Sequence, residues 1–261
     1  MKAFNGRLVV RRDGPIVVVG PKRAYKLALR RVLRQRLAME LAGNRQACAD
    51  PFWRDAVLPV RGGPFGLIMP AGDPVDERDP RVDQCLATRL QALETAPRDR
   101  ADRLVATAIL DHLAVAEDDR VRRARILNQL AGFQLPRSSA HGDFHHGNLL
   151  ARDGQLAIID WGCYRRVSSF LLDAVHYRIR YWCLQRRRSW VDVAYGDQWA
   201  AADMRRLAER FEVRPDQLVA AYAVNRASLE TAQYLPALRE PPRAVSVKHR
   251  AVIERVDDDL R

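Results

Sequence analysis

The chain has 261 residues, 48% of them hydrophobic and 29% charged, and a formal net charge of +12. It is long enough to bury a full core in one large domain or two lobes, and no apolar run approaches the ~20 residues that cross a bilayer. Its four cysteines are scattered without a CxxC pair, and no signal peptide is visible. We therefore expect reduced thiols in the cytoplasm, and neither a disulfide framework nor a zinc knuckle.

The positive charge comes mainly from arginine and has three interpretations. It can be a solvated basic surface, a field that attracts an anionic substrate, or a surface for nucleic acid or membranes. The densest basic runs, at 30–36 and 186–188, are not interleaved with aromatic residues. Because single-strand binders need such aromatic platforms, no nucleic-acid partner is expected.

The N-terminal third predicts three short strands, over 7–11, 15–19 and 24–29, followed by a helix over 30–48. Lys26 interrupts the third, otherwise apolar strand. Burying its charge is costly without a partner, so Lys26 is either an edge residue that reaches solvent or a lysine that binds phosphate. Glu40, the single acid of the helix, pairs either with Arg36 on the surface or with Lys26.

The next segments predict a hairpin of strands 56–60 and 65–69, and then a Pro/Gly-rich hinge at 70–74. Helical spacing follows over 82–95, 100–115 and 118–132, and we interpret these helices as core scaffold. Further helices are predicted at the end of the chain, over 167–186, 198–211, 215–234 and 245–260.

The stretch 141–162 carries the strongest chemical signal. Asp143 lies in a polar loop, Asn148 follows after four residues, and Asp160 ends an apolar run. Between Asn148 and Asp160 the sequence predicts a β-hairpin whose Asp153-Gly154 turn is of type I′. The hairpin brings Asn148 and Asp160 together, and with Asp143 they provide the groups that position a hydroxyl and hold Mg²⁺ against phosphate.

This stretch resembles the aminoglycoside phosphotransferase and choline kinase branch of the protein-kinase-like superfamily. That branch has a His-Gly-Asp-x-x-x-x-Asn loop, and a hairpin leads from it to an Asp that opens a tripeptide like Asp-Phe-Gly. Here these are His141-Gly142-Asp143, Asn148 and Asp160-Trp161-Gly162. The resemblance is clear over about residues 135–180 and weaker over 1–75.

The resemblance implies a role for each matching residue. Asp143 would orient and deprotonate the acceptor hydroxyl, and Asn148 and Asp160 would hold Mg²⁺. Lys26, with Lys22 in reserve, would bind the α- and β-phosphates of ATP, and Glu40 would steady Lys26. His141 would orient the loop. Asp173 would support it through hydrogen bonds.

One feature departs from this pattern. No glycine-rich phosphate loop precedes Lys26, and the turn at 11–15, which contains Asp13, occupies its place. His141, His145 and His146 also form a cluster that could bind zinc. Zinc would explain neither Asp143 nor Asn148, and we therefore prefer phosphoryl transfer.

We predict an α+β, two-lobed protein-kinase-like fold. Residues 1–70 would form a small β-rich N-lobe that clamps the nucleotide, 71–76 a hinge, and 77–261 a helical C-lobe with the catalytic loop and metal-binding hairpin. The predicted function is phosphotransfer from Mg·ATP to a hydroxyl of a small molecule, such as a sugar or saccharide-containing metabolite, and the charge favours an anionic acceptor. The alternatives are a non-catalytic kinase-like module that binds nucleotide or a partner, and a protein- or lipopolysaccharide-type kinase.

Overall fold

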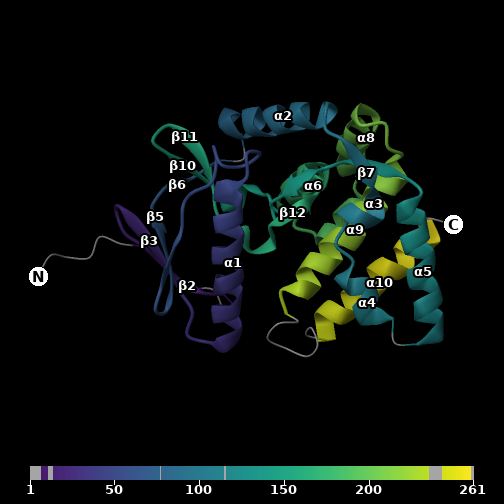
Figure 1. Cartoon of the computed structure of the whole chain (residues 1–261), viewed down its shortest axis with the longest axis horizontal. Helices are drawn as coiled ribbons and strands as arrows, with labels where there is room; N and C mark the ends of the chain where they lie inside the picture. Colours follow the sequence, from purple (N-terminus) through teal and green to yellow (C-terminus); the bar gives the residue numbers. More distant parts are fainter. Residues whose placement is uncertain (1–6, 11–13, 77, 115, 235–242, 260–261) are drawn as a thin grey trace, which may run out of the picture. The chain divides into compact units, whose positions relative to one another are not determined.

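The computed structural model describes residues 7–10, 14–76, 78–114, 116–234 and 243–259 (Figure 1). Its contacts divide the chain into two compact units. The first unit consists of Met1–Cys85 and His146–Tyr164, and the second of Leu86–His145 and Arg165–Arg261. The predicted turn at 11–15 falls largely outside the described residues.

An antiparallel five-stranded sheet forms the body of the first unit. Its strand order is β1-β2-β3-β5-β4, so that the third and fifth strands of the chain lie side by side. Short apolar runs separated by turn residues produce β1, β2, β3 and β5, as the sequence predicts, whereas β4 is not predicted. The strands are β1 (Arg7–Val10), β2 (Ile16–Val19), β3 (Arg23–Leu27), β4 (Arg61–Gly63) and β5 (Gly66–Pro70).

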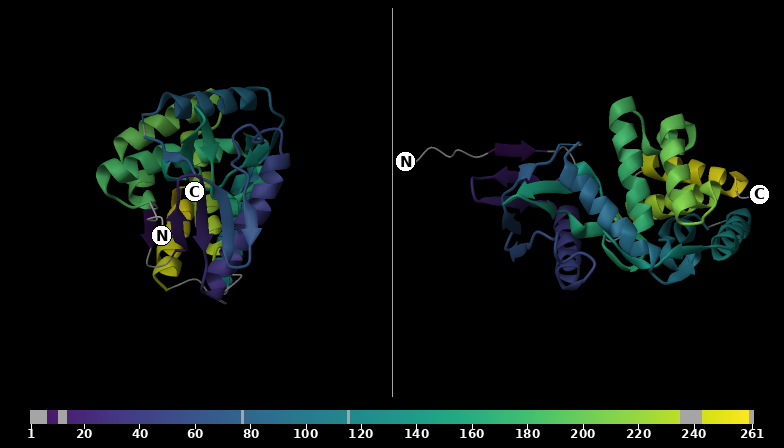
Figure 2. Two further views of the ribbon diagram at one scale, coloured as in Figure 1. Left: turned by 90° about the vertical axis from the view of Figure 1, so that its left-hand side faces the viewer. Right: turned by 90° about the horizontal axis from the view of Figure 1, so that it is seen from above.

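Helix α1 (Arg31–Ala49) packs on this sheet (Figures 1 and 2). Its buried side includes Leu37, Glu40 and Asn44, which recur at helical spacing. Leu37 belongs to the apolar core, whereas Glu40 brings a carboxylate to the buried side. The members of this core are Ala24, Ala28, Leu37, Leu58, Val60, Leu67, Met69 and Ala157.

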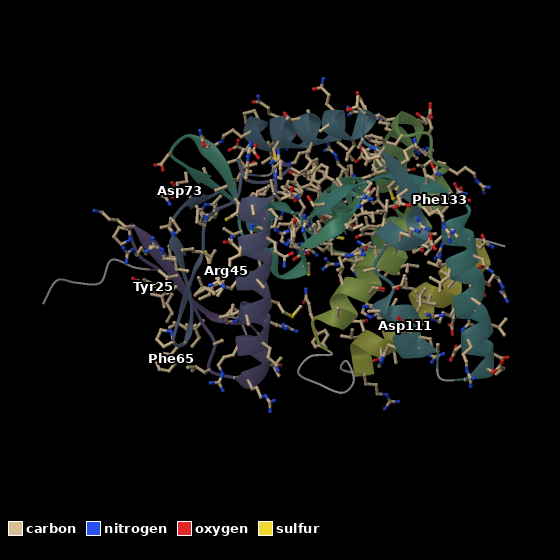
Figure 3. The ribbon with its side chains drawn as sticks, in the orientation of Figure 1. Tyr25, Arg45, Phe65, Asp73, Asp111 and Phe133 are labelled. Carbon is tan, nitrogen blue, oxygen red and sulfur yellow. The ribbon has the colours of Figure 1, made fainter. Side chains whose placement is uncertain are left out.

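The predicted strand at 56–60 is wrong. The Asn44 side chain donates to the Leu58 carbonyl at 2.8 Å and accepts from the Val60 N–H at 3.0 Å. These bonds use backbone groups that a strand ladder would need, so the segment makes only one isolated bridge, from Val57 to Ile158. The partner of β5 is instead β4, and exposed Phe65 lies in the turn between them (Figure 3).

The predicted hairpin consists of β10 (Leu149–Arg152) and β11 (Gln155–Ile158). Both turn residues have positive φ, 51° at Asp153 and 78° at Gly154, as a type I′ turn requires. The hairpin also pairs with β6 (Asp73–Pro74), in the segment expected to be a hinge. This pairing, the bridge from Val57 to Ile158 and the contact of α1 with the turn after the hairpin group it with the first unit. The lobe boundaries at 70 and 76 stay a prediction.

The second unit consists mainly of helices. The helix predicted over 100–115 is divided into α3 (Ala101–Leu104) and α4 (Ala108–Leu113). Side chains of a later helix cause the division, because Asn225 accepts from the Ala106 N–H at 2.9 Å and Ser228 from the Ile109 N–H at 3.3 Å. Such side-chain bonds replace the intrahelical ones at a break.

Helices α6 (Phe170–Arg186), α8 (Gln198–Arg210), α9 (Pro215–Ala232) and α10 (Arg243–Asp259) pack around a shared core (Figures 1 and 2). Nearly all of α9 between 218 and 231 is buried. None of the described helices has the length and apolar character of a membrane span. The remaining elements of this part are α5 (Glu117–Ala131), α7 (Trp190–Gly196), β7 (Arg98–Arg100), β8 (Gln134–Pro136), β9 (Ser138–Ala140) and β12 (Arg165–Ser168); α2 (Pro80–Glu94) contains the unit boundary.

Candidate active site

A buried ion pair joins β3 to α1 in the first unit. The Nζ atom of Lys26 lies 2.6 Å from Oε1 of Glu40, and the side chains are 8% and 4% exposed. The Oδ2 atom of Asp160, whose side chain is 47% exposed, lies 3.5 Å from the same Nζ. One lysine is therefore shared by a buried and a partly exposed carboxylate. We call these three residues the lysine cluster.

The charge balance of this cluster is reflected in the pKa values of its members. Burial disfavours the charged form of Lys26, but the charges of Asp160 and Glu40 outweigh it and raise the pKa of the lysine. Burial and the charge of Asp160 raise the pKa of Glu40 to about 7, although Lys26 opposes this. Two carboxylates compete for one cation, and the cluster is short of positive charge near neutral pH.

The β10–β11 hairpin places Asp160 and Asn148 at its open end. Leu149 pairs with Ile158, and the Ile159 N–H donates to the Asn148 carbonyl at 3.0 Å. Asn148 is buried, and Asp160 has a left-handed backbone with φ 66°. Lys22, the reserve candidate, is exposed in the turn between β2 and β3.

Helix α1 also contacts the 3-10 turn η2 (Trp161–Cys163), which directly follows Asp160. A Cβ atom on Gly43 would lie 2.0 Å from the Trp161 carbonyl oxygen, so only glycine permits this approach. The Trp161 ring is fully buried, and its Nε1 donates to the Ile158 carbonyl at 3.0 Å. These contacts fix the helix that carries Glu40 against the segment that carries Asp160.

Asp143 belongs to the second unit, in a loop supported by α6. The carboxylate of Asp173 accepts from the backbone N–H groups of His141, at 2.6 Å, and Gly142, at 2.8 Å. These are the hydrogen bonds expected of Asp173. The loop turns at Gly142, whose φ is 81°. Buried His141 accepts at Nδ1 from the Asp143 N–H at 3.2 Å, which suits an orienting role.

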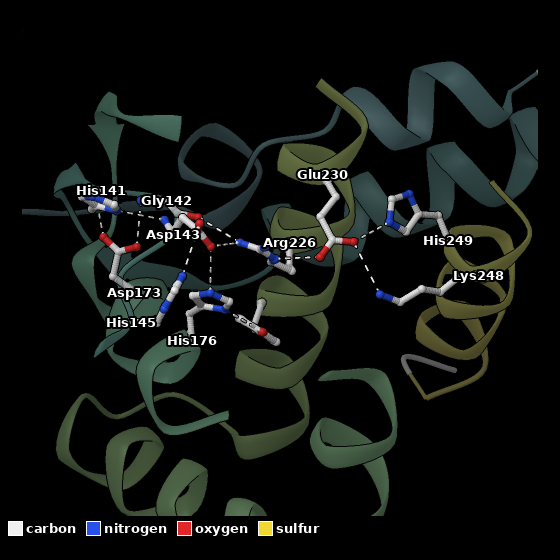
Figure 4. A network of polar contacts seen from close by, with 11 residues as sticks. His141, Gly142, Asp143, His145, Asp173, His176, Arg226, Glu230, Lys248 and His249 are labelled. Carbon is white, nitrogen blue, oxygen red and sulfur yellow. Dashed lines mark hydrogen bonds and ion pairs between the residues drawn. The ribbon is translucent and has the colours of Figure 1, made fainter. Parts of the chain in front are cut away.

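Basic groups surround the carboxylate of Asp143 (Figure 4). Arg226 Nη1 lies 2.7 Å and His176 Nε2 3.2 Å from Oδ1, and His145 Nε2 lies 3.6 Å from Oδ2. Burial would raise the pKa of Asp143, but Arg226, His145 and His176 together hold it well below its usual value. The carboxylate is therefore ionised throughout the neutral range.

Sequence reasoning did not find Arg226 or His176. They lie 83 and 33 positions after Asp143, and no local pattern joins them to it. One signal was available, because Tyr222, Arg226 and Glu230 recur every four residues in the mostly apolar run that forms α9. Such a polar stripe on a buried helix requires partners inside the protein.

The zinc interpretation receives no support from the described part of the chain. There, no group of three or more histidine, cysteine, aspartate or glutamate side chains could hold a metal ion. His141 is instead buried against the loop backbone, and His145 faces the carboxylate of Asp143.

The model of the phosphotransferase enzyme family matches residues 68–210, more than half of the chain, and the protein belongs to this family. No curated protein matches it significantly in sequence.

Solved structures confirm the predicted fold class, a protein-kinase-like fold with a small β-rich and a larger helical lobe. A thermostable mutant of the aminoglycoside phosphotransferase APH(4)-Ia, in complex with ADP and hygromycin B, matches with a TM-score of 0.58 and 14% identity over 98% of this chain and 94% of that one. ADP-bound APH(2'')-Ib matches with a TM-score of 0.55 and 17% identity, over 100% of this chain and 95% of that one. The streptomycin–ATP complex of APH(2")-IIa matches with a TM-score of 0.54 and 15% identity, over 98% of this chain and 93% of that one.

Proposed function

We propose that this protein is an ATP-dependent phosphotransferase that phosphorylates a hydroxyl group of a small molecule. The observation that carries the proposal is the lysine cluster, in a chain that belongs to a phosphotransferase family. A buried strand lysine paired with a helix glutamate is the arrangement by which kinases hold the α- and β-phosphates of ATP. The solved relatives with ATP or ADP support the same nucleotide.

In this proposal Lys26 binds the phosphates and Glu40 holds Lys26 in place. A nucleotide brings negative charge to a lysine that already has two carboxylate neighbours, so further positive charge is required. Mg²⁺ would supply it by neutralising phosphate oxygens.

Asp160 and Asn148 fit a magnesium ion. Mg²⁺ prefers oxygen ligands and commonly takes only one or two from protein when phosphates supply the others. Asp160 offers a partly exposed carboxylate, and the hairpin holds the amide residue Asn148 beside it in the fold. A site of this kind does not require a cluster of three protein acids.

Asp143 is the proposed base and orienting group for the acceptor hydroxyl. Its contacts with Arg226 and His176 hold an ionised carboxylate, which accepts a hydrogen bond from a hydroxyl. With so low a pKa it is a weak base, so its main contribution would be to orient the hydroxyl, as expected for phosphoryl transfer, where positioning dominates.

The proposed acceptor is a sugar or saccharide-containing metabolite that is neutral or anionic near the reacting hydroxyl. The groups around Asp143 are basic, and the whole chain carries +12. These charges favour such an acceptor over a polycationic aminoglycoside.

The cytoplasm is the proposed compartment. All four cysteines are free thiols, and Cys85, Cys163 and Cys183 are buried. Free thiols are usual for proteins of a reducing compartment.

The test is ATP turnover with Mg²⁺ across neutral, acidic and cationic hydroxyl acceptors, for wild type, Asp143→Ala and Asp111→Asn. Asp111 is an exposed aspartate of the second unit that is ion-paired with Arg123 and serves as the matched control. We expect turnover with at least one neutral or acidic acceptor, a loss of ~10²–10⁴-fold in Asp143→Ala, and wild-type rates in the control. If Asp143→Ala matches wild type, the role of Asp143 is wrong. Nucleotide binding without turnover would indicate a non-catalytic module.

A further inference from the structure

Two helices of the second unit hold the same oxygen atom of Asp143 (Figure 4). Arg226, on α9, donates from Nη1 to Oδ1 at 2.7 Å, and His176, on α6, has Nε2 3.2 Å from the same Oδ1. Both side chains are well buried, at 13% and 3% exposure. Two separate contacts at one oxygen fix the plane of the carboxylate and reduce its rotation, because each partner is anchored to a different helix.

The tautomer of His176 follows from its two partners. An ionised Asp143 can only accept, so Nε2 must carry the proton. Burial, with help from Arg226, lowers the pKa of His176 to about 3, and the ring is therefore neutral with a bare Nδ1. The Tyr222 hydroxyl lies 3.0 Å from Nδ1, and burial raises its pKa far above its ordinary value, which keeps it a donor. The hydrogen bonds thus run from Tyr222 to His176 to Asp143.

Arg226 is positioned in the same way. Its Nε donates to Oε1 of Glu230, one turn further along α9, at 2.9 Å. The other oxygen of Glu230 contacts His249 Nε2 at 2.9 Å and Lys248 Nζ at 3.5 Å, both from α10. Arg226 Nη1 also lies 3.4 Å from the Gly142 carbonyl oxygen of the catalytic loop. The guanidinium is thereby attached to α9, to α10 through Glu230, and to the loop.

We propose that Arg226 and His176 are positioning residues of the phosphotransfer reaction, which hold the Asp143 carboxylate in one orientation and keep it ionised. Tyr222 acts through His176 by donating to Nδ1 and so orienting the ring, and Glu230 acts through Arg226. The inference rests on the proposed function, since it assumes that Asp143 receives the acceptor hydroxyl.

The charges that face Asp143 agree with this assignment. The groups that face Asp143 are Arg226 on α9, the neutral ring of His176 on α6, His145 on the loop itself, and Asp173 beneath the loop. Burial favours the neutral acid, and the basic groups outweigh burial and hold the pKa of Asp143 well below its usual value. Arg226 is the permanently charged cation of this group, and replacing it with a neutral residue removes that charge from beside Asp143. The pKa of Asp143 should then rise, and the acidic limb of the rate profile should move to higher pH.

The first experiment compares the pH dependence of kcat and kcat/KM in wild type, Arg226→Gln, Arg226→Lys and Arg125→Gln. Arg125 forms an ion pair with buried Asp257 elsewhere in the second unit, at 2.8 Å, and is the matched control. Arg226→Gln should reduce kcat roughly tenfold to a hundredfold and leave the KM for ATP within about twofold, because misplaced catalytic groups affect the reaction more than nucleotide binding. The acidic limb of the Arg226→Gln rate profile should move to higher pH. Arg226→Lys should recover part of the lost kcat and part of the pH shift. Arg125→Gln should change neither kcat nor the acidic limb.

The second experiment does not depend on turnover. In ¹⁵N-histidine NMR spectra of wild type, His176 should appear as the neutral tautomer protonated at Nε2 and remain so down to about pH 4. Tyr222→Phe keeps the packing but removes the donor to Nδ1. Asp143 still holds the proton on Nε2, so the tautomer should stay the same, but the ring loses one of its two anchors and kcat should fall several-fold. A wild-type His176 that is protonated at Nδ1, or that becomes charged near pH 6, would overturn the assignment whether or not the variants fold.

The outcomes separate this inference from the proposed function. Absence of turnover in wild type with every acceptor contradicts both. An active wild type with Arg226→Gln equal to Arg125→Gln in kcat and in the position of the acidic limb contradicts the inference alone. Thermal unfolding of each variant identifies loss of rate that comes from loss of fold.

Discussion

The lysine cluster of the first unit and the residues around Asp143 in the second have opposite arrangements. Lys26 lies between two carboxylates, those of Glu40 and Asp160, whereas one carboxylate, Asp143, is approached by Arg226 and two histidines. The first cluster is short of positive charge and suits a bound cation. In the second, the charge of Arg226 and the contacts with the two histidines keep a carboxylate ionised.

The difference shows how the same residue types are given different tasks by their surroundings. In the first unit burial and a second acid raise the pKa of Glu40 to about 7, and in the second basic neighbours hold the pKa of Asp143 well below its usual value. Opposite shifts of two carboxylates indicate different roles. We assign charge neutralisation to the first cluster and orientation of a hydroxyl to the second.

The largest effect is expected from removal of the exposed acid of the lysine cluster. Asp160→Asn keeps the shape of the side chain but removes the charge that we propose binds Mg²⁺, and we expect kcat to fall by about a hundredfold or more. Stabilisation by ATP should become largely independent of Mg²⁺. Thermal-shift titrations with ATP, with and without Mg²⁺, measure this, and Asp153→Asn, in the exposed turn of the same hairpin, is the control. An equal shift in wild type and Asp160→Asn would exclude the metal role.

A smaller effect is expected from disturbing the contact between α1 and the turn after Asp160. In Gly43→Ala the new Cβ would meet backbone, the Trp161 carbonyl oxygen at 2.0 Å, and neither element can yield easily. We expect a loss of about 3 kcal/mol in the free energy of unfolding, as for a severe overpacking substitution. Gly196→Ala, where a Cβ meets nothing within 4 Å, should change it by about 0.5 kcal/mol or less. Urea unfolding of both variants measures these changes. Equal stabilities would show that Gly43 approaches the Trp161 carbonyl less closely than described.

The smallest effect concerns the acid that supports Arg226. Burial opposes ionisation of Glu230, but hydrogen bonding to His249 and the charge of Arg226 lower its pKa to about 2, from an ordinary 4.5. A lowered pKa stabilises the folded protein above about pH 4.5, and this contribution is lost as the pH falls from 4.5 towards 2.

Glu230→Gln should therefore cost roughly 2 kcal/mol of unfolding free energy at pH 7, and the deficit should shrink towards zero near pH 2. Denaturant unfolding over this range measures it. Glu94→Gln, at an exposed acid that also pairs with an arginine, is the control and should have little effect. A deficit that does not change with pH would show that Glu230 acts by packing alone.

The sequence predicts those parts of the fold whose causes are local. The hairpin follows from Asp153 and Gly154, which both adopt positive φ, and the helices follow from apolar spacing. The strand at 56–60 and the continuous helix at 100–115 are wrong because distant polar side chains bind their backbone. Asn44 does so in the first case, and Asn225 and Ser228 in the second.

The same distinction applies to the candidate site. Lys26 and Glu40 are visible in the sequence because each is a charge at an unusual place, and Asp143, Asn148 and Asp160 because they share one short stretch. Arg226 and His176 depend on the packing of α6 and α9, which sequence spacing does not encode. Their roles, like those of the predicted residues, stay predictions that the variants above can test.

The left-handed backbone of Asp160, with φ 66° and ψ 56°, restricts which amino acids can evolve there. Glycine, asparagine and aspartate adopt this conformation with little strain, and most other residues do so only at a cost of about 1–2 kcal/mol. A carboxylate that binds a metal could otherwise come from glutamate as well as aspartate. Aspartate alone meets both requirements, so a homologue with glutamate at this position would be expected to have changed its backbone there or to lack the proposed metal site.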